Sequence, residues 1–215
     1  MFCKKLHRLF GEMKKYNFPF DDKEIPRNGI YILFEKGEAG HDGDRIVRIG
    51  THTGKNQLRS RLRQHFLNEN KDRSIFRKNI GRALLNRDND NFLEFWELDL
   101  TTRVAKDKFL HLIDMKKQKE IEKKVSDYIK NNFSFVVFQV DDVEDRLRLE
   151  SRIISSVSRC EECGPSENWF GLNSPKKKIR DSGLWLVNEL YKEPISEEDF
   201  LELERLIRDG GCNNL

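Results

Sequence analysis

The sequence predicts an α/β fold, because runs of strand type alternate with segments that have the periodicity of helices. The first two strand-type runs, residues 29–36 and 45–52, are rich in β-branched and aromatic side chains. The connection between them, GEAGHDGD, is rich in Gly and Asp, which favours a hairpin with a fairly long loop. The two runs are therefore expected to be antiparallel neighbours in a sheet.

Further elements follow from the same patterns. Additional strands are expected at residues 91–100, which contain Phe92, Phe95 and Trp96, and at 133–140. Helices are expected at 55–69, 76–87, about 104–131, 141–159 and 196–209. The segment at about 104–131 mixes Glu and Lys at spacings of three and four, which is typical of a solvated helix face.

Length and composition indicate one soluble domain, residues 1–215, with 37% hydrophobic and 36% charged residues. Lys, Arg or His interrupts the first twenty residues every few positions, so we expect no signal peptide, no membrane span and a cytoplasmic location. The net charge is only +3, so binding to a polyanion would depend on local basic clusters.

Four cysteines are present: Cys3, Cys160, Cys163 and Cys212. The only C-x-x-C pair is CEEC, and no second C-x-x-C or H-x3-H pair supplies the two further ligands that tetrahedral zinc needs. We therefore expect free thiols, and Glu161 and Glu162 would oppose a reactive thiolate. His41 is expected to be a solvated loop residue.

Glu150 has an unexpected position in the amphipathic helix at 141–159. At 3.6 residues per turn it projects from the middle of an apolar stripe, and a carboxylate there needs a partner. The residues of this stripe are Val143, Leu147, Ile154 and Val157.

Other polar residues could join Glu150 in one site. In the register that pairs the glycines of NGIY and RIG, Tyr31 lies opposite Arg48 on one sheet face, although a surface cation-π pair is an alternative. Arg61 and His65 are four residues apart and border an apolar helix stripe, where a solvated face is the alternative. Together these residues permit an anion site with a nearby carboxylate.

With these residues the chain resembles a GIY-YIG nuclease. NGIYILF matches the first signature, with Tyr31 as its tyrosine, and VRIGTH stands where the second is expected. LRSRLRQHF resembles the family's helix that carries an Arg and, four residues later, a His or Tyr. RLRLESRIISSV resembles the helix that presents a metal-binding Glu, and NWFGLNSP resembles a loop that contributes an Asn. The matches occur in the family's order, from residue 29 to about 175.

The resemblance implies a small central antiparallel sheet of three strands flanked by helices. It implies a catalytic core at 25–178 with a helical insertion at about 104–131, and terminal elaborations at 1–24 and 179–215.

The resemblance also implies a metal-dependent endonuclease that hydrolyses DNA phosphodiester bonds. Tyr31 would be the general base, Arg61 would hold the phosphate, His65 would assist proton movement or contact the phosphate, and Glu150 would ligate Mg²⁺ or Mn²⁺. Two alternatives remain open. Glu150 could instead pair with a buried arginine, Arg61 or Arg48, and Asn173 could be a site residue or only a turn residue before Ser-Pro.

Arg48 departs from the family, because RIG replaces the tyrosine of the second motif. A phenol with an ordinary pKa of about 10 is a poor base near neutrality, and a cation beside Tyr31 would lower that value. Arg48 could supply this cation and could also bind a phosphate oxygen. Further residues expected to contact the DNA backbone, or simply to be solvated, are Arg59, Arg63, Lys176, Lys177 and Lys178.

Several functions fit these residues. A restriction or defence nuclease is one, and the two sites of a homodimer could then cut both strands. A repair or mobile-element nuclease is equally allowed, and a catalytically inactive nucleic-acid-binding module of the same fold is suggested by Arg48. A structural or interaction protein would require the site residues to lie apart.

Overall fold

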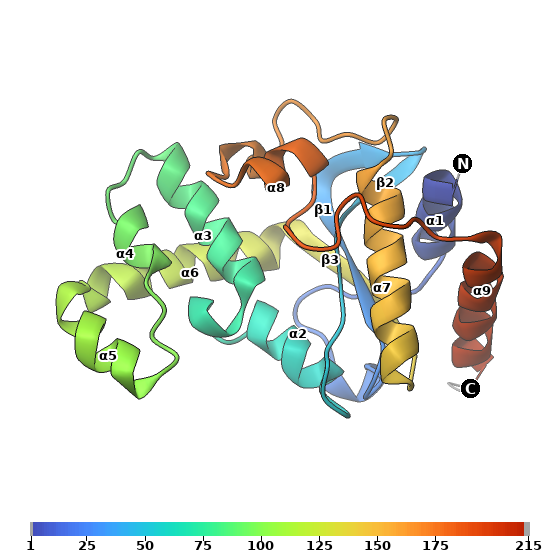
Figure 1. The fold of residues 1–215 in the computed structure, drawn as a ribbon, viewed down its shortest axis with the longest axis horizontal. Helices are drawn as coiled ribbons and strands as arrows, with labels where there is room; N and C mark the ends of the chain where they lie inside the picture. Colours follow the sequence, from blue (N-terminus) through green and yellow to red (C-terminus); the bar gives the residue numbers. More distant parts are fainter. Residues whose placement is uncertain (1, 213–215) are drawn as a thin grey trace.

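A three-stranded antiparallel sheet lies between two groups of helices, as Figure 1 shows. The structure is a computed structural model and describes residues 2–212. The strands are β1 (Ile30–Gly40), β2 (Gly43–Gly50) and β3 (Phe133–Phe138), in the order β2-β1-β3. The predicted α/β class and the antiparallel pairing of the first two strands are confirmed.

Helices form most of the remaining structure in the described part of the chain. The α-helices are α1 (Phe2–Gly11), α2 (Leu58–Phe66), α3 (Ile75–Arg87), α4 (Leu93–Glu97), α5 (Arg103–Phe109), α6 (Met115–Asn132), α7 (Val143–Ser158), α8 (Lys177–Ser182) and α9 (Glu197–Cys212). Short 3-10 turns are η1 (Asp22–Glu24), η2 (Lys71–Arg73), η3 (Leu110–Leu112) and η4 (Phe170–Asn173). Between residues 2 and 212, no helix combines the length and the apolar character that crossing a membrane requires.

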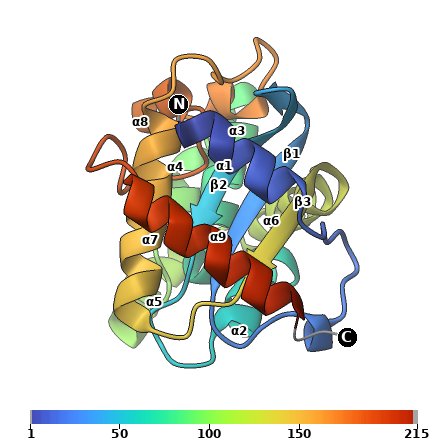
Figure 2. The ribbon, with the colours of Figure 1, turned by 90° about the vertical axis from the view of Figure 1, so that its right-hand side faces the viewer.

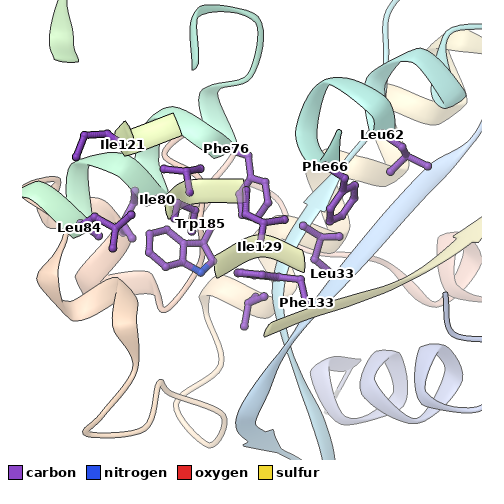
Figure 3. Packing of buried hydrophobic residues seen from close by; sticks show 14 of the residues in the cluster. Leu33, Leu62, Phe66, Phe76, Ile80, Leu84, Ile121, Ile129, Phe133 and Trp185 are labelled. Atoms are coloured by element: carbon purple, nitrogen blue, oxygen red, sulfur yellow. The ribbon is translucent and has the colours of Figure 1, made fainter. Parts of the chain in front are cut away.

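The two faces of the sheet pack against different helices. Alternate residues of β1 point to opposite faces, so Tyr31 and Leu33 join one core while Ile30 and Ile32 join the other. Figure 3 shows the first core, in which Leu33 packs near side chains from α2, α3 and α6. The second core is formed with α1, α7 and α9, and Figure 2 shows α1 and α9 lying across this face. The first and last helices of the described residues thus pack on the same face of the sheet.

The hairpin turn is tighter than predicted. Both strands extend into the Gly- and Asp-rich segment, and only His41 and Asp42 separate the paired residues Gly40 and Gly43. His41 has φ 51° and Asp42 has φ 67°, the left-handed conformations of a two-residue hairpin turn. The expectation of a long loop was wrong, because the backbone hydrogen bonds of a ladder can continue through polar residues.

The register of the hairpin also differs from the predicted one. Tyr31 pairs with Gly50, and Arg48 pairs with Leu33. The pairing shifts between Leu33 and Phe34, where β2 has Val47 as an extra residue. The turn, this bulge and a second irregularity between Phe34 and Ala39 of β1 determine the register, so matching the motif glycines to each other gave the wrong partners. Arg48 still lies on the same face as Tyr31, two residues along the ladder.

The predicted strand at 91–100 is wrong, because this segment forms the short helix α4. Phe92 and Trp96 are four residues apart and both are buried, which is the spacing of one helix face. The Trp96 indole packs where a Cβ at Gly81 of α3 would overlap it, and it donates a 3.0 Å hydrogen bond to the Lys78 carbonyl. Packing against α3 thus overrides the strand propensity of the aromatic residues.

The predicted helix at about 104–131 is broken before residue 115 into α5, η3 and α6. Asp114 caps α6 by accepting hydrogen bonds of 2.9 and 3.0 Å from Lys116 N and Lys117 N. One face of α6 is solvated, but Glu122 is buried and forms a 2.8 Å ion pair with Arg77 of α3. This pair joins α6 to the rest of the helical group.

The apolar stripe predicted for α7 is partly wrong. Val143 is 39% exposed and Leu147 is 42% exposed. The side chains that α7 buries against the sheet include Leu149, Ile153 and Ile154, so the buried face is rotated relative to the prediction. Glu150 consequently lies at the border of this face and is half-buried.

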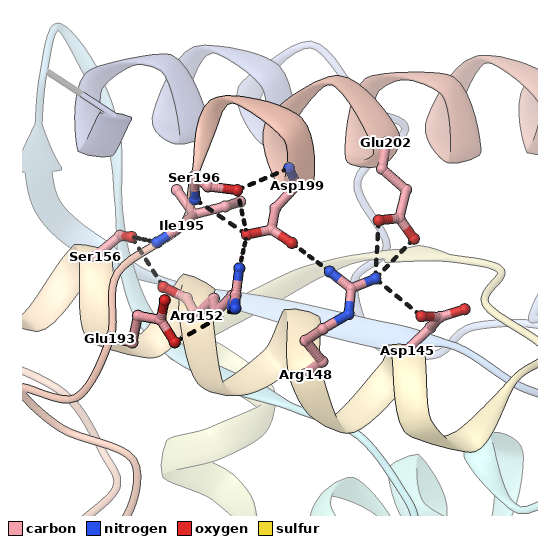
Figure 4. A network of polar contacts seen from close by, with 9 residues as sticks. All are labelled: Asp145, Arg148, Arg152, Ser156, Glu193, Ile195, Ser196, Asp199 and Glu202. Carbon is pink, nitrogen blue, oxygen red and sulfur yellow. Dashed lines mark hydrogen bonds and ion pairs between the residues drawn. The ribbon is translucent and has the colours of Figure 1, made fainter.

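An ion-pair network joins α9 to α7, as Figure 4 shows. The Asp199 carboxylate, which is 5% exposed, accepts from both Arg148 and Arg152. Arg148 also pairs with Glu202 at 2.8 Å. Ser196 caps the start of α9, because its hydroxyl accepts from Asp199 N at 3.1 Å and donates to the Asp199 carboxylate at 2.7 Å. α9 is therefore held to the helix that carries Glu150.

We predict that Asp199→Asn lowers the free energy of unfolding by about 2–3 kcal/mol, because it leaves two arginines without their buried counter-charge. Urea unfolding measures this change. Asp209→Asn on the exposed part of α9 is the matched control and should change stability by less than about 0.5 kcal/mol. Equal stability of the two variants would show that the network does not hold α9.

Candidate active site

A cavity of about 310 Å³ opens at the end of β2, between α2 and α7. The loop after β2, the outer face of α2 and one turn of α7 form its wall. The residues that line it are Thr51, His52, Thr53, Gln57, Ser60, Arg61, Gln64, Leu147 and Glu150. Two residues expected in the site, Arg61 and Glu150, therefore face the same space from different helices.

Glu150 is held by the end of β2. Its Oε1 accepts a 3.0 Å hydrogen bond from Thr51 N. Burial raises the pKa of Glu150 to about 7, while Arg48 and the Thr51 hydrogen bond oppose the rise. Within residues 2–212 the carboxylate forms no ion pair, neither with Arg48 nor with Arg61. The paired-arginine alternative for Glu150 therefore has no direct contact to support it.

The donor atoms around Glu150 suit a hard divalent cation. Besides Glu150, the residues that line the cavity include Ser60, Gln57 and Gln64, whose side chains carry oxygen atoms, and no cysteine lines it. Mg²⁺ prefers oxygen ligands, keeps several waters and is commonly held by one carboxylate together with substrate phosphate. Glu150 is the residue that would hold such an ion.

Tyr31 lies across the end of β2. A Cβ on Gly50, its partner in the ladder, would overlap the Tyr31 phenol, so only glycine leaves room for the ring. The phenol oxygen is 2.7 Å from Nε2 of His65. The residue after Gly50 is Thr51, whose backbone N–H donates to Glu150. Two consecutive residues at the end of β2 therefore position the Tyr31 phenol and the Glu150 carboxylate. The Tyr31 side chain is fully buried in this arrangement.

His65 is a buried neutral imidazole. Burial lowers its pKa well below the ordinary value, and the nearby Arg48, Arg61 and Arg77 lower it further. Its Nδ1 is 2.7 Å from Ser74 Oγ, which also accepts from Arg77 N at 3.2 Å. With the proton on Nδ1, His65 donates to Ser74 and accepts from the Tyr31 hydroxyl through Nε2.

The Arg48 side chain is held by Trp185. Its Nη1 donates to the Trp185 carbonyl, and its guanidinium carbon lies 5.2 Å from the centre of the Phe76 ring. Trp185 is itself held by Val47 O, which accepts from its backbone N at 2.8 Å, and by Glu35, which accepts from its indole at 2.8 Å. The Nε of Arg48 is buried without a hydrogen-bond partner within the described residues, so one donor is still available.

Arg61 extends along α2 to the cavity wall. Its Nη1 donates to Gln64 Oε1 and to the Arg73 carbonyl, both at 3.2 Å. These are neutral acceptors, so the guanidinium charge can attract an anion in the cavity.

Like Tyr31, Arg48 and His65, the remaining candidates do not line this cavity. The Asn173 side chain donates to the Phe170 carbonyl at 3.1 Å within its own turn, and Arg59 donates to the Ile25 carbonyl at 2.7 Å. Arg63 pairs with Asp22, and Lys177 pairs with Asp181 at 2.7 Å. Lys178 Nζ is 3.5 Å from the Val187 carbonyl, and Lys176 lines a separate cavity of about 550 Å³ beside α4. Roles for these residues in DNA contact stay predictions.

Sequence reasoning missed Thr51 and His52, which follow the second motif directly. Thr51 Oγ1 donates to the Gly29 carbonyl at 2.7 Å, and His52 Nε2 accepts from Gly29 N at 3.3 Å. Together they join the beginning of β1 to the end of β2. The only available signal was their position after RIG, because hydrogen bonds to backbone atoms leave no pattern in side-chain spacing.

We predict that wild-type protein loses stability as the pH falls below about 6.5, partly through His65. The unfolded chain takes up a proton on His65 in this range, but the folded chain, with its lowered pKa, does not. His65→Gln should therefore have a shallower fall in unfolding free energy between about pH 6.5 and 5, by up to about 1.4 kcal/mol per pH unit. Exposed His111→Gln is the control, and identical slopes for His65→Gln and wild type would contradict the prediction.

Comparison with protein families supports the resemblance noted from the motifs. A family model described as a GIY-YIG domain matches residues 2–211, which includes the terminal helices α1 and almost all of α9. Searches of curated proteins and of solved structures found no match. Because the family model spans nearly the whole sequence, this chain belongs to the GIY-YIG domain family, and membership supports a nuclease.

Proposed function

We propose that this protein is a metal-dependent endonuclease that hydrolyses DNA phosphodiester bonds. The observation that carries the proposal is the shared cavity of Arg61 and Glu150, which lies at the strand end where Tyr31 contacts His65. A phosphodiester needs charge neutralisation, a base for the attacking water and assistance to the leaving oxygen. Arg61, Tyr31, His65 and Glu150 carry the chemical groups that these three requirements call for.

Each residue has a distinct task in the proposed reaction. Arg61 binds a nonbridging phosphate oxygen and neutralises the charge that develops on phosphorus. Tyr31 accepts a proton from the attacking water while its own hydroxyl proton passes to His65 Nε2, so the proton count balances. The unpartnered Nε of Arg48 can donate to the phenol oxygen or to the phosphate.

Glu150 would hold Mg²⁺ or Mn²⁺ in the cavity, and a bound divalent cation supplies charge stabilisation to the phosphate and the leaving oxygen. The Thr51 hydrogen bond fixes Oε1 of Glu150, and Glu150 lines the cavity.

DNA must open a path to Tyr31, because the phenol is fully buried without substrate. In this proposal the loop between β2 and α2, in which Thr53 is exposed, moves to open that path. This requirement, together with Arg48 in place of the motif tyrosine, favours a second candidate function. The protein would then bind nucleic acid without cutting it.

A restriction or defence role is one biological setting for the proposed nuclease, and a repair or mobile-element role is another. In the first setting a homodimer would convert supercoiled plasmid directly to linear DNA, whereas a single site would accumulate nicked circles. Gel analysis of the first products separates these two cases.

We predict that Glu150→Gln reduces Mg²⁺-dependent plasmid cleavage by at least about 1,000-fold, because several kcal/mol of transition-state stabilisation depend on the metal. Cleavage of supercoiled plasmid with Mg²⁺, Mn²⁺ or EDTA measures the loss. Binding of a labelled duplex in EDTA should be retained. Glu144→Gln, an exposed change on the same helix, should cleave like wild type.

Two results would contradict the proposal. Equal cleavage by Glu150→Gln and wild type would exclude Glu150 as the metal ligand. Binding of DNA without cleavage by wild type, on plasmids of varied sequence and with either metal, would favour the binding-module function.

We predict that Arg48→Met lowers the cleavage rate by about 100-fold, because it removes a buried donor beside the reacting groups. The thermal midpoint should fall by only a few degrees, because removal of a costly buried charge partly offsets the loss of the hydrogen bond from Arg48 Nη1 to the Trp185 carbonyl. Single-turnover cleavage and thermal unfolding measure the two effects. An unchanged rate would show that Arg48 has no role in cleavage.

A further inference from the structure

A second group of potential metal ligands lies apart from the Glu150 cavity. The ligand atoms of Cys3, His41, Cys160 and Cys163 all lie within 4.8 Å of one another. They come from α1, from the β1–β2 turn and from the segment after α7. We propose that these four residues bind a structural zinc ion in a tetrahedral Cys₃His site.

The distances agree with such a site. Zn–S bonds of about 2.3 Å and tetrahedral geometry place ligand atoms about 3.8 Å apart. The sulfurs of Cys3 and Cys163 are 3.3 Å apart, and His41 Nε2 is 3.2 Å from the Cys160 sulfur. Small outward movements would admit the ion. A disulfide needs sulfurs about 2.05 Å apart, and the cysteines at positions 3, 160 and 163 are free thiols in this structure.

His41 is oriented as a ligand rather than as the solvated loop residue that the sequence suggested. Its side chain is only 4% exposed although it is part of a turn, and Nε2 points to the cysteines. Its Nδ1 is 3.6 Å from the Glu162 carboxylate. Metal-bound histidines commonly donate their second N–H to a carboxylate, which orients the ring.

His7 is close to the cluster but is not one of the ligands. Its Nε2 accepts from Ile46 N at 3.2 Å, so its Nδ1 carries the proton and donates to the Cys3 carbonyl at 2.9 Å. Both nitrogens are therefore engaged. The His7 ring packs edge-on against His41 with centroids 5.0 Å apart, which further restricts the His41 ring.

The donor set distinguishes this site from the cavity at Glu150. Three thiolates and an imidazole favour zinc, whereas Mg²⁺ prefers oxygen. Four protein ligands leave no open position, which is characteristic of a structural rather than a catalytic zinc. Cys160 and Cys163 have the C-x-x-C spacing of zinc sites, and the fold supplies the two missing ligands from positions 3 and 41. The side chain of Cys212 lies outside the described residues.

A zinc ion here would join three segments that are far apart in the sequence. α1 would be attached to the tip of the hairpin and to the end of α7. α7 carries Glu150, so the ion would hold the strand and the helix of the active site in their relative positions. This role is independent of whether the protein cuts DNA.

Metal analysis of wild-type protein, purified under reducing conditions, tests the proposal. We expect about one zinc ion per chain by mass spectrometry of the metal content. Cobalt added to chelator-treated protein should give the visible bands of a tetrahedral ion and a thiolate-to-cobalt charge-transfer band. Removal of zinc by a strong chelator should lower the thermal midpoint, and added zinc should restore it.

Variants identify the ligands. Cys163→Ser and His41→Ala should lose zinc and change the cobalt spectrum, whereas His111→Ala, an exposed histidine in η3, should keep both. Glu150→Gln should also keep full zinc content, which separates this site from the proposed catalytic metal. The wild-type cobalt spectrum remains informative even if a cysteine variant fails to fold.

Absence of zinc and of the cobalt bands in reduced wild-type protein would overturn the proposal. A Cys3–Cys163 disulfide in protein purified without reductant, combined with absence of metal binding after reduction, would also overturn it. Full zinc content in His41→Ala would exclude His41 and hence the Cys₃His assignment.

Discussion

The close contact between Tyr31 and Gly50 is the constraint on which the site depends. Only a residue without a Cβ lets the Tyr31 ring cross the end of β2, and only there does the phenol reach His65. The residue after Gly50 holds the Glu150 carboxylate by its backbone N–H. A shift in the pairing of β1 with β2 would therefore separate both contacts at once. The register of one hairpin thus determines both the contact of Tyr31 with His65 of α2 and the contact of Thr51 with Glu150 of α7.

Hydrogen bonds among buried side chains also stabilise this arrangement. Glu35 accepts hydrogen bonds from the indoles of Trp169 and Trp185, at 2.7 and 2.8 Å, and the Trp185 carbonyl accepts from Arg48. Burial raises the pKa of Glu35, while hydrogen bonds from Tyr128 and the two indoles oppose the rise. A buried arginine is costly unless its donors are satisfied, and the buried Nε of Arg48 has no partner among the described residues. We interpret the remaining donor as a group reserved for substrate.

α7 connects the two proposed metal sites, since it carries Glu150 and ends just before Cys160. The helices at the two ends of the chain reinforce it, because α9 is attached to α7 by Asp199 and α1 contributes Cys3. The family match over residues 2–211 agrees with this integration of the terminal segments. Stability and catalysis are therefore expected to be coupled through one helix.

Local patterns in the sequence determined the α/β class, most helices and the pairing of the first two strands, because residue periodicity and turn composition act within a few positions. They also singled out Tyr31, Arg61, His65 and Glu150, whose motifs are short and contiguous. Tertiary structure decided the register of the hairpin, since it depends on a two-residue turn and on two irregularities of the ladder, at Val47 and between Phe34 and Ala39. It made residues 93–97 a helix through the contact of Trp96 with α3. It alone brought Cys3 and His41 to the C-x-x-C pair, because ligands from separate elements meet only when the elements pack.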